Sequence, residues 1–288
     1  MALDLRAQKR KAEALLSLHR CGDTLVLLNV WDPIGARILE KKGYHAVATA
    51  SAALSASLGY QDGEKIQRST AIDLIARVAR SVAIPVTADI EMGYGKSLAE
   101  LEETVEQVIE SEAVGLNLED SLKTGEGTRI LRTLEEQCHR IAKVRQVAER
   151  KGVPLVINAR VDTYFCLSTK EDATEEAVAR AKSYSKAGAD CIYPIGPGDE
   201  ATIRILRDRI KDPINILASP SAAPLLVLRE LGVNRVSFGP FVFRSVLRRF
   251  VEIAEAVMAN EDYSIFGEVM TDAQVGEFLR TEPEPEPD

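Results

Sequence analysis

The stretch PLVINARVD, residues 154–162, decides how this chain folds. Its apolar run is too short for a helix and follows Gly152, a residue type that commonly ends helices. Polar side chains then follow at Asn158, Arg160 and Asp162. Because they are spaced two apart, they point to the same side of an extended strand. The stretch is therefore typical of a buried parallel strand with functional groups at its carboxyl end.

The same pattern recurs along the whole chain. Seven further apolar runs, each followed by a segment of helical period, are LVLLNV from Leu25, AVATA from Ala46, PVTADI from Pro85, GLNLED from Gly115, CIYPIG from Cys191, INILAS from Ile214 and RVSFGP from Arg235. Eight alternating units predict an α/β fold, a TIM-type (β/α)8 barrel. With no Gly/Ser-rich linker, we expect one domain over residues 1–280, with the barrel proper at about 25–263. The acidic tail 281–288 is expected to be disordered.

Composition limits the classes of partner. The 288 residues carry a formal net charge of -8, with acidic and basic residues interspersed, so neither nucleic acid nor a membrane is expected to bind. An anionic substrate must then be captured by local cations. Four cysteines without CxxC spacing, and an N-terminus without a secretory apolar segment, favour the cytoplasm.

Acidic groups gather where the predicted strands end. The polar residues at these positions are Asn29, Trp31 and Asp32, Asp62 and Glu64, Asp89 and Glu91, Asn117, Glu119 and Asp120, and Asn158, Arg160 and Asp162. Converging carboxylates repel one another unless a cation lies between them, and carboxylate ligands favour Mg²⁺, with Mn²⁺ as an alternative. The competing interpretation is a purely structural set of ion pairs with Arg160, Lys96 or Lys123. Zinc is disfavoured because the three histidines lie away from this end.

The segment Leu122–Thr133 is long for a barrel loop and mixes glycine with cations. It is predicted to be a mobile lid, in which Lys123, Arg129 or Arg132 neutralises a substrate carboxylate. The alternative is a solvated loop without a role.

Four motifs carry a family resemblance: ATASAALSASLGYQD at 48–62, ADIEMGYG at 88–95, GLNLEDS at 115–121 and NARVDTYF at 158–165. In this order they resemble the phosphoenolpyruvate mutase and isocitrate lyase superfamily, which includes 2-methylisocitrate lyase-like and carboxyvinyl-carboxyphosphonate phosphorylmutase-like enzymes. The resemblance implies that Asp89, Glu91 and Glu119 bind Mg²⁺, with Asp62 completing the shell.

The resemblance also implies roles for the remaining site residues. Arg160 would bind substrate and stabilise enolate charge, the amides of Ser51 and Ala52 would hold a carboxylate, and Trp31 would frame the pocket floor. The implied catalytic residues are Arg160, Glu119, Asp62 and Lys123, and the implied substrate-binding residues are Trp31, Ser51, Ala52, Asp62, Asp89 and Arg160.

Three departures narrow the expected activity. Glu91 stands where many members carry Asp, Ala50 and Ser51 stand where members commonly have Ser and Gly, and the lid has no Cys or His. In addition, YPIG at 193–196 replaces the usual histidine near the sixth strand end. We therefore expect a Mg²⁺-dependent enzyme that cleaves a C–C bond in a small α-keto or α-hydroxy acid through an enolpyruvate-like intermediate, as a lyase or decarboxylase. The alternatives are a P–C bond phosphonomutase or hydrolase, an aldolase of another barrel family, and a catalytically silent α-keto acid-binding barrel. The resemblance also implies that the C-terminal helix after Tyr263 is exchanged between the subunits of a dimer or tetramer.

Overall fold

The strands form a closed barrel. The computed structural model describes residues 4–124, 127–260 and 263–280. The barrel strands are β1 (Leu25–Leu27) with its continuation β2 (Asn29–Val30), β3 (Val47–Thr49), β4 (Val86–Asp89), β5 (Gly115–Glu119), β8 (Val156–Val161), β9 (Cys191–Pro194), β10 (Asn215–Leu217) and β11 (Arg235–Ser237). All eight predicted strand positions are confirmed, and the neighbouring strands are parallel.

Two sheets close the ring through a bridge on one side and through the first predicted strand on the other. Six strands pair in the order β2-β3-β4-β5-β8-β9, and three in the order β1-β11-β10. A parallel bridge between Ile192 and Ile214 joins β9 to β10. On the other side β1 runs directly into β2, and Leu28 between them accepts a hydrogen bond of 3.3 Å from the Ala48 amide. The first predicted strand is thus shared by both sheets.

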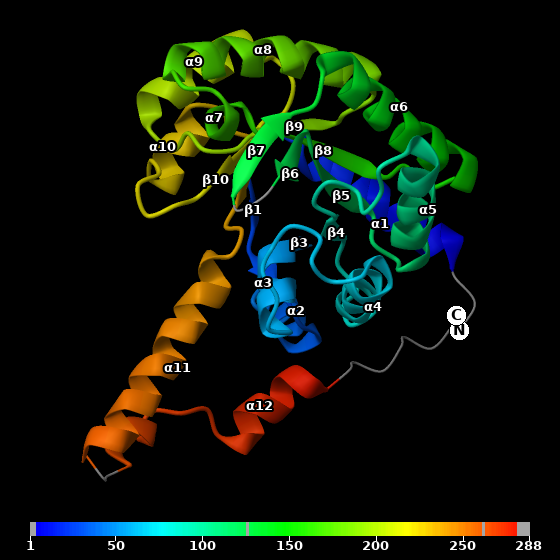
Figure 1. The fold of residues 1–288 in the computed structure, drawn as a ribbon. Helices are drawn as coiled ribbons and strands as arrows, with labels where there is room; N and C mark the ends of the chain where they lie inside the picture. Colours follow the sequence, from blue (N-terminus) through cyan, green and yellow to red (C-terminus); the bar gives the residue numbers. More distant parts are fainter. Residues whose placement is uncertain (1–3, 125–126, 261–262, 281–288) are drawn as a thin grey trace.

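Helices surround the barrel (Figure 1). Those that follow the strands are α2 (Pro33–Lys41), α3 (Ser51–Ser57), α4 (Arg68–Ala79), α5 (Leu98–Glu110), α6 (Leu134–Lys151), α7 (Thr163–Cys166), α8 (Lys170–Ala187), α9 (Glu200–Arg209) and α10 (Leu225–Glu230). Gly152 and Gly188 end α6 and α8 in the left-handed conformation, as the glycine punctuation predicts.

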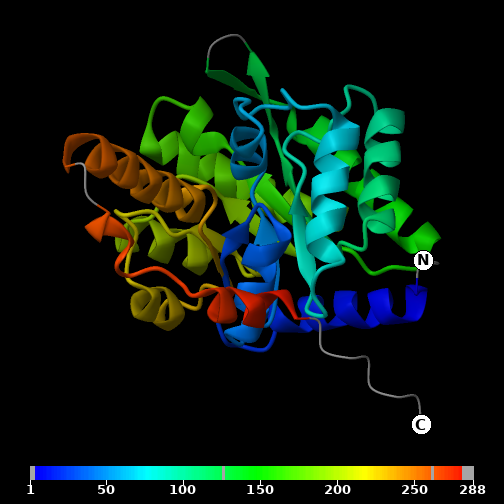
Figure 2. The same ribbon diagram turned by 90° about the horizontal axis from the view of Figure 1, so that it is seen from below.

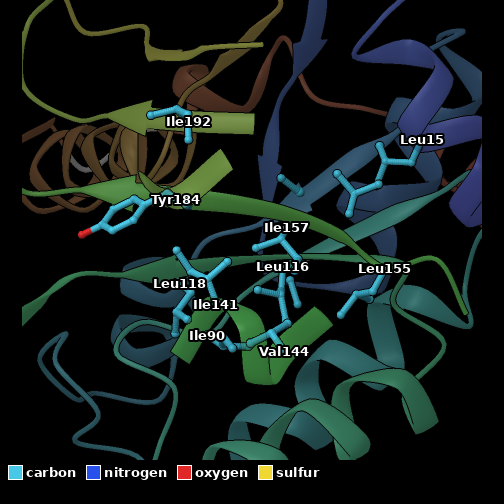
Figure 3. Packing of buried hydrophobic residues seen from close by; sticks show 14 of the residues in the cluster. Leu15, Ile90, Leu116, Leu118, Ile141, Val144, Leu155, Ile157, Tyr184 and Ile192 are labelled. Carbon is cyan, nitrogen blue, oxygen red and sulfur yellow. The ribbon is translucent and has the colours of Figure 1, made fainter. Parts of the chain in front are cut away.

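The core lies between the barrel wall and these helices. Figure 3 shows Leu116 and Leu118 of β5 with Ile157 of β8, packed close to Ile141 and Val144 of α6. Each of these side chains is buried. The alternation along β5 sends Leu116 and Leu118 outward to the helices, so Asn117 and Glu119 face the barrel interior.

The two ends of the barrel are closed differently. Helix α1 (Leu5–Leu18) lies across the amino-terminal end, where Gln8 Nε2 donates to the carbonyl oxygens of Ile109 at 2.7 Å and Ala113 at 3.3 Å. At the opposite end, β6 (Ser121–Thr124) and β7 (Thr128–Leu131) form an antiparallel hairpin. Figure 2 shows this hairpin and α1 on opposite sides of the barrel. The segment predicted as a lid loop is therefore a hairpin that rises from the carboxyl end of the barrel strands.

The C-terminal part leaves the barrel. Helix α11 (Phe241–Asn260) projects away from the barrel, and η1 (Ser264–Phe266) leads to α12 (Asp272–Leu279), which returns towards α2 (Figure 1). Arg37 of α2 donates to the Leu279 carbonyl at 3.1 Å, and Phe278 is buried. The tail predicted to be disordered lies outside the described residues. Within the described ranges, no helix is long and apolar enough to cross a membrane.

Candidate active site

A cavity of about 440 Å³ opens at the carboxyl ends of the strands. Its lining residues are Asn29, Ala50, Ser51, Ala52, Asp62, Asp89, Asn117, Gly127, Arg129, Arg160, Phe165, Tyr193, Ile195, Leu217, Ser237, Gly239, Pro240 and Arg244. The structure therefore brings together five of the predicted site residues, which are Ser51, Ala52, Asp62, Asp89 and Arg160. This is the end at which barrel enzymes carry their catalytic groups.

Ser51 links two of the carboxylates. It is the first residue of α3, directly after β3, and its amide donates to Asp89 Oδ2 at 3.1 Å. Its hydroxyl oxygen lies 2.8 Å from Asp89 Oδ2 and 3.1 Å from Asp62 Oδ1. Because a hydroxyl has a single proton, it donates to one carboxylate at a time. The amide that was expected to hold a substrate carboxylate thus holds Asp89 in this structure.

Lys123 of the hairpin joins Asp62 to Glu91. Its ammonium lies 2.6 Å from Asp62 Oδ2 and 3.3 Å from Glu91 Oε2. Burial disfavours the charged ammonium, but the carboxylates of Glu119 and Asp62 outweigh burial and raise the pKa of Lys123. Burial and the neighbouring Asp62 raise the pKa of Glu91 to about 8. The site therefore carries more negative charge than Lys123 alone neutralises.

Glu91 is held away from the cavity by its own backbone. Glu64, Glu91 and Tyr94 all adopt the left-handed conformation, with φ of 57°, 50° and 51°. The Glu64 amide and the Tyr94 hydroxyl donate to Glu91 at 2.9 and 3.2 Å, and the Tyr94 amide donates to Glu64 at 2.7 Å. Such backbone strain persists only where surrounding contacts determine the conformation. These contacts direct the longer Glu91 side chain towards Lys123.

Two arginines neutralise the acids at the ends of β5 and β8. Arg160 donates to Glu119 at 2.6 Å and to Asp162 at 2.8 Å. Arg129 of the hairpin donates to the same two carboxylates at 2.8 and 2.9 Å and to the Ser121 hydroxyl at 2.9 Å. Burial raises the pKa of Glu119, whereas Arg160 and Arg129 outweigh burial and lower the pKa of Asp162. This network fixes the guanidinium of Arg160 at the cavity wall.

The residues predicted as metal ligands do not form one cluster. In the described part of the chain, no group of three or more His, Cys, Asp or Glu side chains is arranged to hold a metal ion. Asp89 borders the cavity, Glu91 contacts Lys123, and Glu119 contacts Arg129 and Arg160. The set Asp89, Glu91 and Glu119 stays a prediction.

The donor set still fits a hydrated divalent cation. The hydrogen-bonded network combines the carboxylates of Asp62, Asp89, Glu91, Glu119 and Asp162 with the cations Lys123, Arg129 and Arg160. Its carboxylates thus outnumber its cations by two. Asp62 and Asp89 both present oxygens to the cavity, and Mg²⁺ commonly binds through one or two carboxylates and several waters.

Trp31 lies elsewhere than expected. Its ring packs edge-on against Phe243 of α11, with centroids 4.9 Å apart, and it does not line the cavity. Its neighbour Asp32 accepts a hydrogen bond from the Gly35 amide at 2.7 Å and caps α2. Trp31 thus lies outside the cavity lining, because the chain turns away after β2 to start α2, and its place at the pocket floor stays a prediction.

Several lining residues were not assigned to the site from the sequence. The predicted site does not include Tyr193 of β9, Ser237 of β11 or Arg244 of α11, and Asn117 was predicted only to be a polar residue at a strand end. A signal was available for the first two, since Tyr193 and Ser237 lie near the strand ends in positions that alternation places inside the barrel. No sequence signal pointed to Arg244, because its place in the cavity depends on the path of α11.

The hairpin covers one side of the cavity. Gly127 and Arg129 line the cavity, and the Arg129 guanidinium carbon lies 5.7 Å from the centre of the Phe165 ring. Arg132, the other candidate cation of the predicted lid, pairs with Glu136 at the start of α6 instead. Arg129 and Lys123 are therefore the two hairpin cations that reach the carboxylate network.

Comparison with known proteins agrees with this geometry. The family model described as phosphoenolpyruvate phosphomutase matches residues 15–258. The chain belongs to this family. It is 32% identical over 244 residues to an uncharacterized protein of Mycobacterium tuberculosis, covering 85% of this chain and 88% of the relative. An oxaloacetate decarboxylase of Rhodopseudomonas palustris is 28% identical over 220 residues, covering 75% and 72%.

Solved structures of the phosphomutase family share the barrel. A provisionally named phosphonomutase from Burkholderia cenocepacia superimposes with a TM-score of 0.80 at 36% identity, covering 86% of this chain and 98% of that chain. A phosphonopyruvate hydrolase in complex with oxalate and Mg²⁺ superimposes with a TM-score of 0.80 at 23% identity, covering 93% and 94%, and shows the common fold. The predicted superfamily and barrel are thus confirmed, and the family is one of enzymes.

Proposed function

We propose that this chain is a Mg²⁺-dependent carbon–carbon lyase or decarboxylase that acts on a small α-keto or α-hydroxy dicarboxylic acid of the oxaloacetate type. The observation that carries the proposal is the position of Arg160, a guanidinium fixed by Glu119 and Asp162 at the wall of a cavity that Asp62 and Asp89 also line. The oxaloacetate decarboxylases among the relatives support the same substrate class.

Arg160 supplies the charge that such a reaction needs. When a carboxylate β to a ketone leaves as CO2, the electron pair of the broken C–C bond becomes an enolate. Arg160 lies where it can bind the keto oxygen and stabilise this developing charge, and its ion pairs hold it ready without reorganisation. A bound Mg²⁺ would polarise the same oxygen as a Lewis acid.

Asp89 and Asp62 are the residues that we expect to hold the metal ion. Both line the cavity, and Ser51 orients both carboxylates. Lys123 balances Asp62 and Glu91 at the edge of the site, and Arg129 closes the network from the hairpin side. The remaining predicted ligands, Glu91 and Glu119, would act on the metal through Lys123, Arg160 or bound water.

Thermal stability tests the site first. Oxalate, a planar analogue of the enolpyruvate anion, should raise the Tm by several degrees when Mg²⁺ is present and not when EDTA replaces it. The substitution Asp89→Ala should abolish this shift, whereas Asp73→Ala, which removes an exposed acid paired with Arg77, should not. A shift that is equal in EDTA would contradict a metal-dependent site.

Turnover then separates the reaction classes. Oxaloacetate should yield pyruvate and CO2 in a Mg²⁺-dependent manner, while phosphonopyruvate should stay intact by ³¹P NMR. The identity of 36% to a provisionally named phosphonomutase keeps P–C bond chemistry as the second candidate, and phosphate release from phosphonopyruvate would favour it. Binding of oxalate without turnover of any acid would favour a silent α-keto acid-binding barrel.

We also propose that the chain forms a homo-oligomer, a dimer or tetramer, by exchange of α11. The helix after Tyr263, which was expected to be exchanged, contacts α2 of its own chain instead. Because α11 leaves the barrel, no helix of the described residues covers β11 and β1 at the place where a (β/α)8 barrel has one. A groove of about 680 Å³ lies at this place, bordered by Leu18, Leu25, Val26, Tyr44 and Leu225 among others. The α11 helix of a second subunit would supply the apolar surface that this groove lacks.

A further inference from the structure

A buried amide layer lies beneath the cavity. Asn117 of β5 is the register partner of Asn158 of β8, and both side chains face the barrel interior with Arg235 of β11. Asn158 and Arg235 are fully buried, whereas Asn117 borders the cavity with 7% of its surface exposed. The layer therefore connects a buried cation to the cavity floor through a single side chain.

The hydrogen bonds of this layer determine how the Asn117 amide is turned. Its Oδ1 accepts from Asn158 Nδ2 at 2.7 Å and from Arg235 Nη2 at 3.3 Å. A guanidinium only donates, so the Asn117 atom that faces Arg235 must be the oxygen. With Oδ1 directed at these two donors, Nδ2 is the amide atom left to face the cavity that Asn117 borders. In the described residues no acceptor contacts this Nδ2.

The layer lowers the stability of the fold. Arg235 Nε and Nη1 and Asn158 Oδ1 are buried without a hydrogen-bond partner among the described residues. Unpartnered buried polar groups destabilise a protein, so each calls for an explanation. Fixing a donor at the floor of an anion-binding cavity explains both the guanidinium and the two amides.

We infer that Asn117 is a substrate-binding residue whose Nδ2 donates a hydrogen bond to a carboxylate or keto oxygen of the substrate, and that Arg235 is a positioning residue that sets this orientation. The inference rests on the proposed function, because it requires a small carboxylate in this cavity. It adds a donor at the floor, opposite in role to the carboxylates of Asp62 and Asp89. A carboxylate oxygen fits this floor and a cation does not.

Calorimetric titration of the full chain with oxalate in the presence of Mg²⁺ tests the inference. The variant Asn117→Asp keeps an acceptor for Asn158 and Arg235 but turns a negative oxygen towards the ligand, so oxalate should bind about a hundredfold more weakly or worse. Asn117→Ala should weaken binding about tenfold or more. The matched control Asn234→Asp makes the same change outside the cavity, where Asn234 bonds His19 and Ile214, and should bind oxalate as the wild type does.

A double-mutant cycle tests the role of Arg235. The substitution Arg235→Met removes the donor that fixes the amide, so it should weaken oxalate binding about tenfold in the wild type and have little effect in the Asn117→Ala background. A purely structural arginine would instead lower the Tm without this dependence on Asn117. Equal losses in both backgrounds would overturn the positioning role.

The outcomes separate this inference from the proposed function. If the wild type binds oxalate and both Asn117 variants, folded by circular dichroism, bind it equally well, Asn117 is not a ligand and the inference alone is wrong. If the wild type binds neither oxalate nor any small α-keto acid, the proposed function fails and the inference fails with it. Weakened binding in both variants with an unchanged Asn234→Asp control supports the inference.

Discussion

At the scale of single residues, the site depends on how each charge is held. The Arg160 guanidinium joins Glu119 of the neighbouring strand to Asp162 of its own strand end, and 11% of its side chain is exposed. A planar fork with fixed donors is suited to this task, whereas an ammonium is a point charge on a flexible stem. The shape of the cation therefore matters here as much as its sign.

The substitution Arg160→Lys should consequently lower kcat/KM for oxaloacetate by about a hundredfold or more. The protein should stay folded, because the positive charge between Glu119 and Asp162 remains. Arg160→Met should in addition lower the free energy of unfolding by about 3 to 5 kcal/mol, since it leaves buried carboxylates short of a partner. Steady-state kinetics and urea unfolding measure both effects. A lysine variant with wild-type kinetics would contradict the role of Arg160.

The sequence predicted the residues of the site better than their contacts. Ser51, Asp62, Asp89 and Arg160 were predicted from strand ends and motifs, and all four line the cavity. Whether Glu91 reaches the cavity could not be predicted, because it depends on a left-handed backbone and on amides from another loop. Local spacing fixes which residues are near one another, but such long-range contacts fix where a flexible carboxylate points.

At the scale of secondary-structure elements, the hairpin is attached to the site through Lys123 of β6 and Arg129 of β7. Arg129 of β7 donates to Glu119 and Asp162 beneath it and lies over the Phe165 ring. The length and composition of the segment predicted that it differs from an ordinary loop, but not that it pairs as two strands. The strand pairing brings Arg129 to the buried acids Glu119 and Asp162. No sequence pattern links Arg129 to these two residues.

The substitution Arg129→Gln should loosen the hairpin, because it removes one of the two hairpin cations that contact the carboxylate network. We expect KM to rise about tenfold, as one charge-assisted contact is lost, and hydrogen exchange to accelerate at 128–131. Arg132→Gln is the matched control, because Arg132 pairs with Glu136 outside the cavity, and it should change neither quantity. Equal effects of both substitutions would mean that Arg129 is only one of many hairpin contacts.

Helix α1 contains a pH-dependent contact at its end. His19 Nδ1 lies 2.8 Å from the Leu15 carbonyl, which can only accept, so the proton resides on Nδ1. Burial, and then the nearby Arg235, lower the pKa of His19 to about 3. Since the unfolded chain has the ordinary pKa of about 6.5, it binds more protons than the folded chain between these values. The stability that neutral His19 provides is therefore lost progressively as the pH falls from about 6.5 towards 3.

Comparison with the variant His19→Gln isolates the contribution of His19 to the pH dependence of stability. Glutamine can still donate to Leu15 but does not titrate. Between pH 7 and pH 4.5, the free energy of unfolding of the variant should therefore fall by about 2 to 3 kcal/mol less than that of the wild type. Urea unfolding at both pH values gives the difference, and the titration of other groups cancels because both proteins share them. Parallel pH profiles would show that His19 is protonated in the folded chain.

At the scale of the whole molecule, eight apolar runs were enough to predict the barrel, because each βα unit can bury its apolar face only by closing with its neighbours. The path of α11 was less accessible. Its period marks a helix, but the choice between covering its own barrel and projecting away depends on surfaces contributed by other parts of the fold. The large apolar side chains that α11 exposes are Val246, Leu247, Phe250, Val251 and Met258.

These side chains predict the outcome of a surface substitution. The side chain of Phe250 is 68% exposed and that of Met258 is 85% exposed. In a protein that does not aggregate, an exposed apolar helix face of this kind marks an interface. We expect the wild type to elute as a dimer or tetramer in size exclusion with light scattering, and Phe250→Asp to shift it towards the monomer, because burying a carboxylate in an apolar groove is unfavourable. Glu255→Gln, a change of another exposed residue of α11, should leave the mass unchanged. A wild type that is monomeric at micromolar concentration would show that α11 is not exchanged, and the groove beside β1 would then have to be covered within one chain.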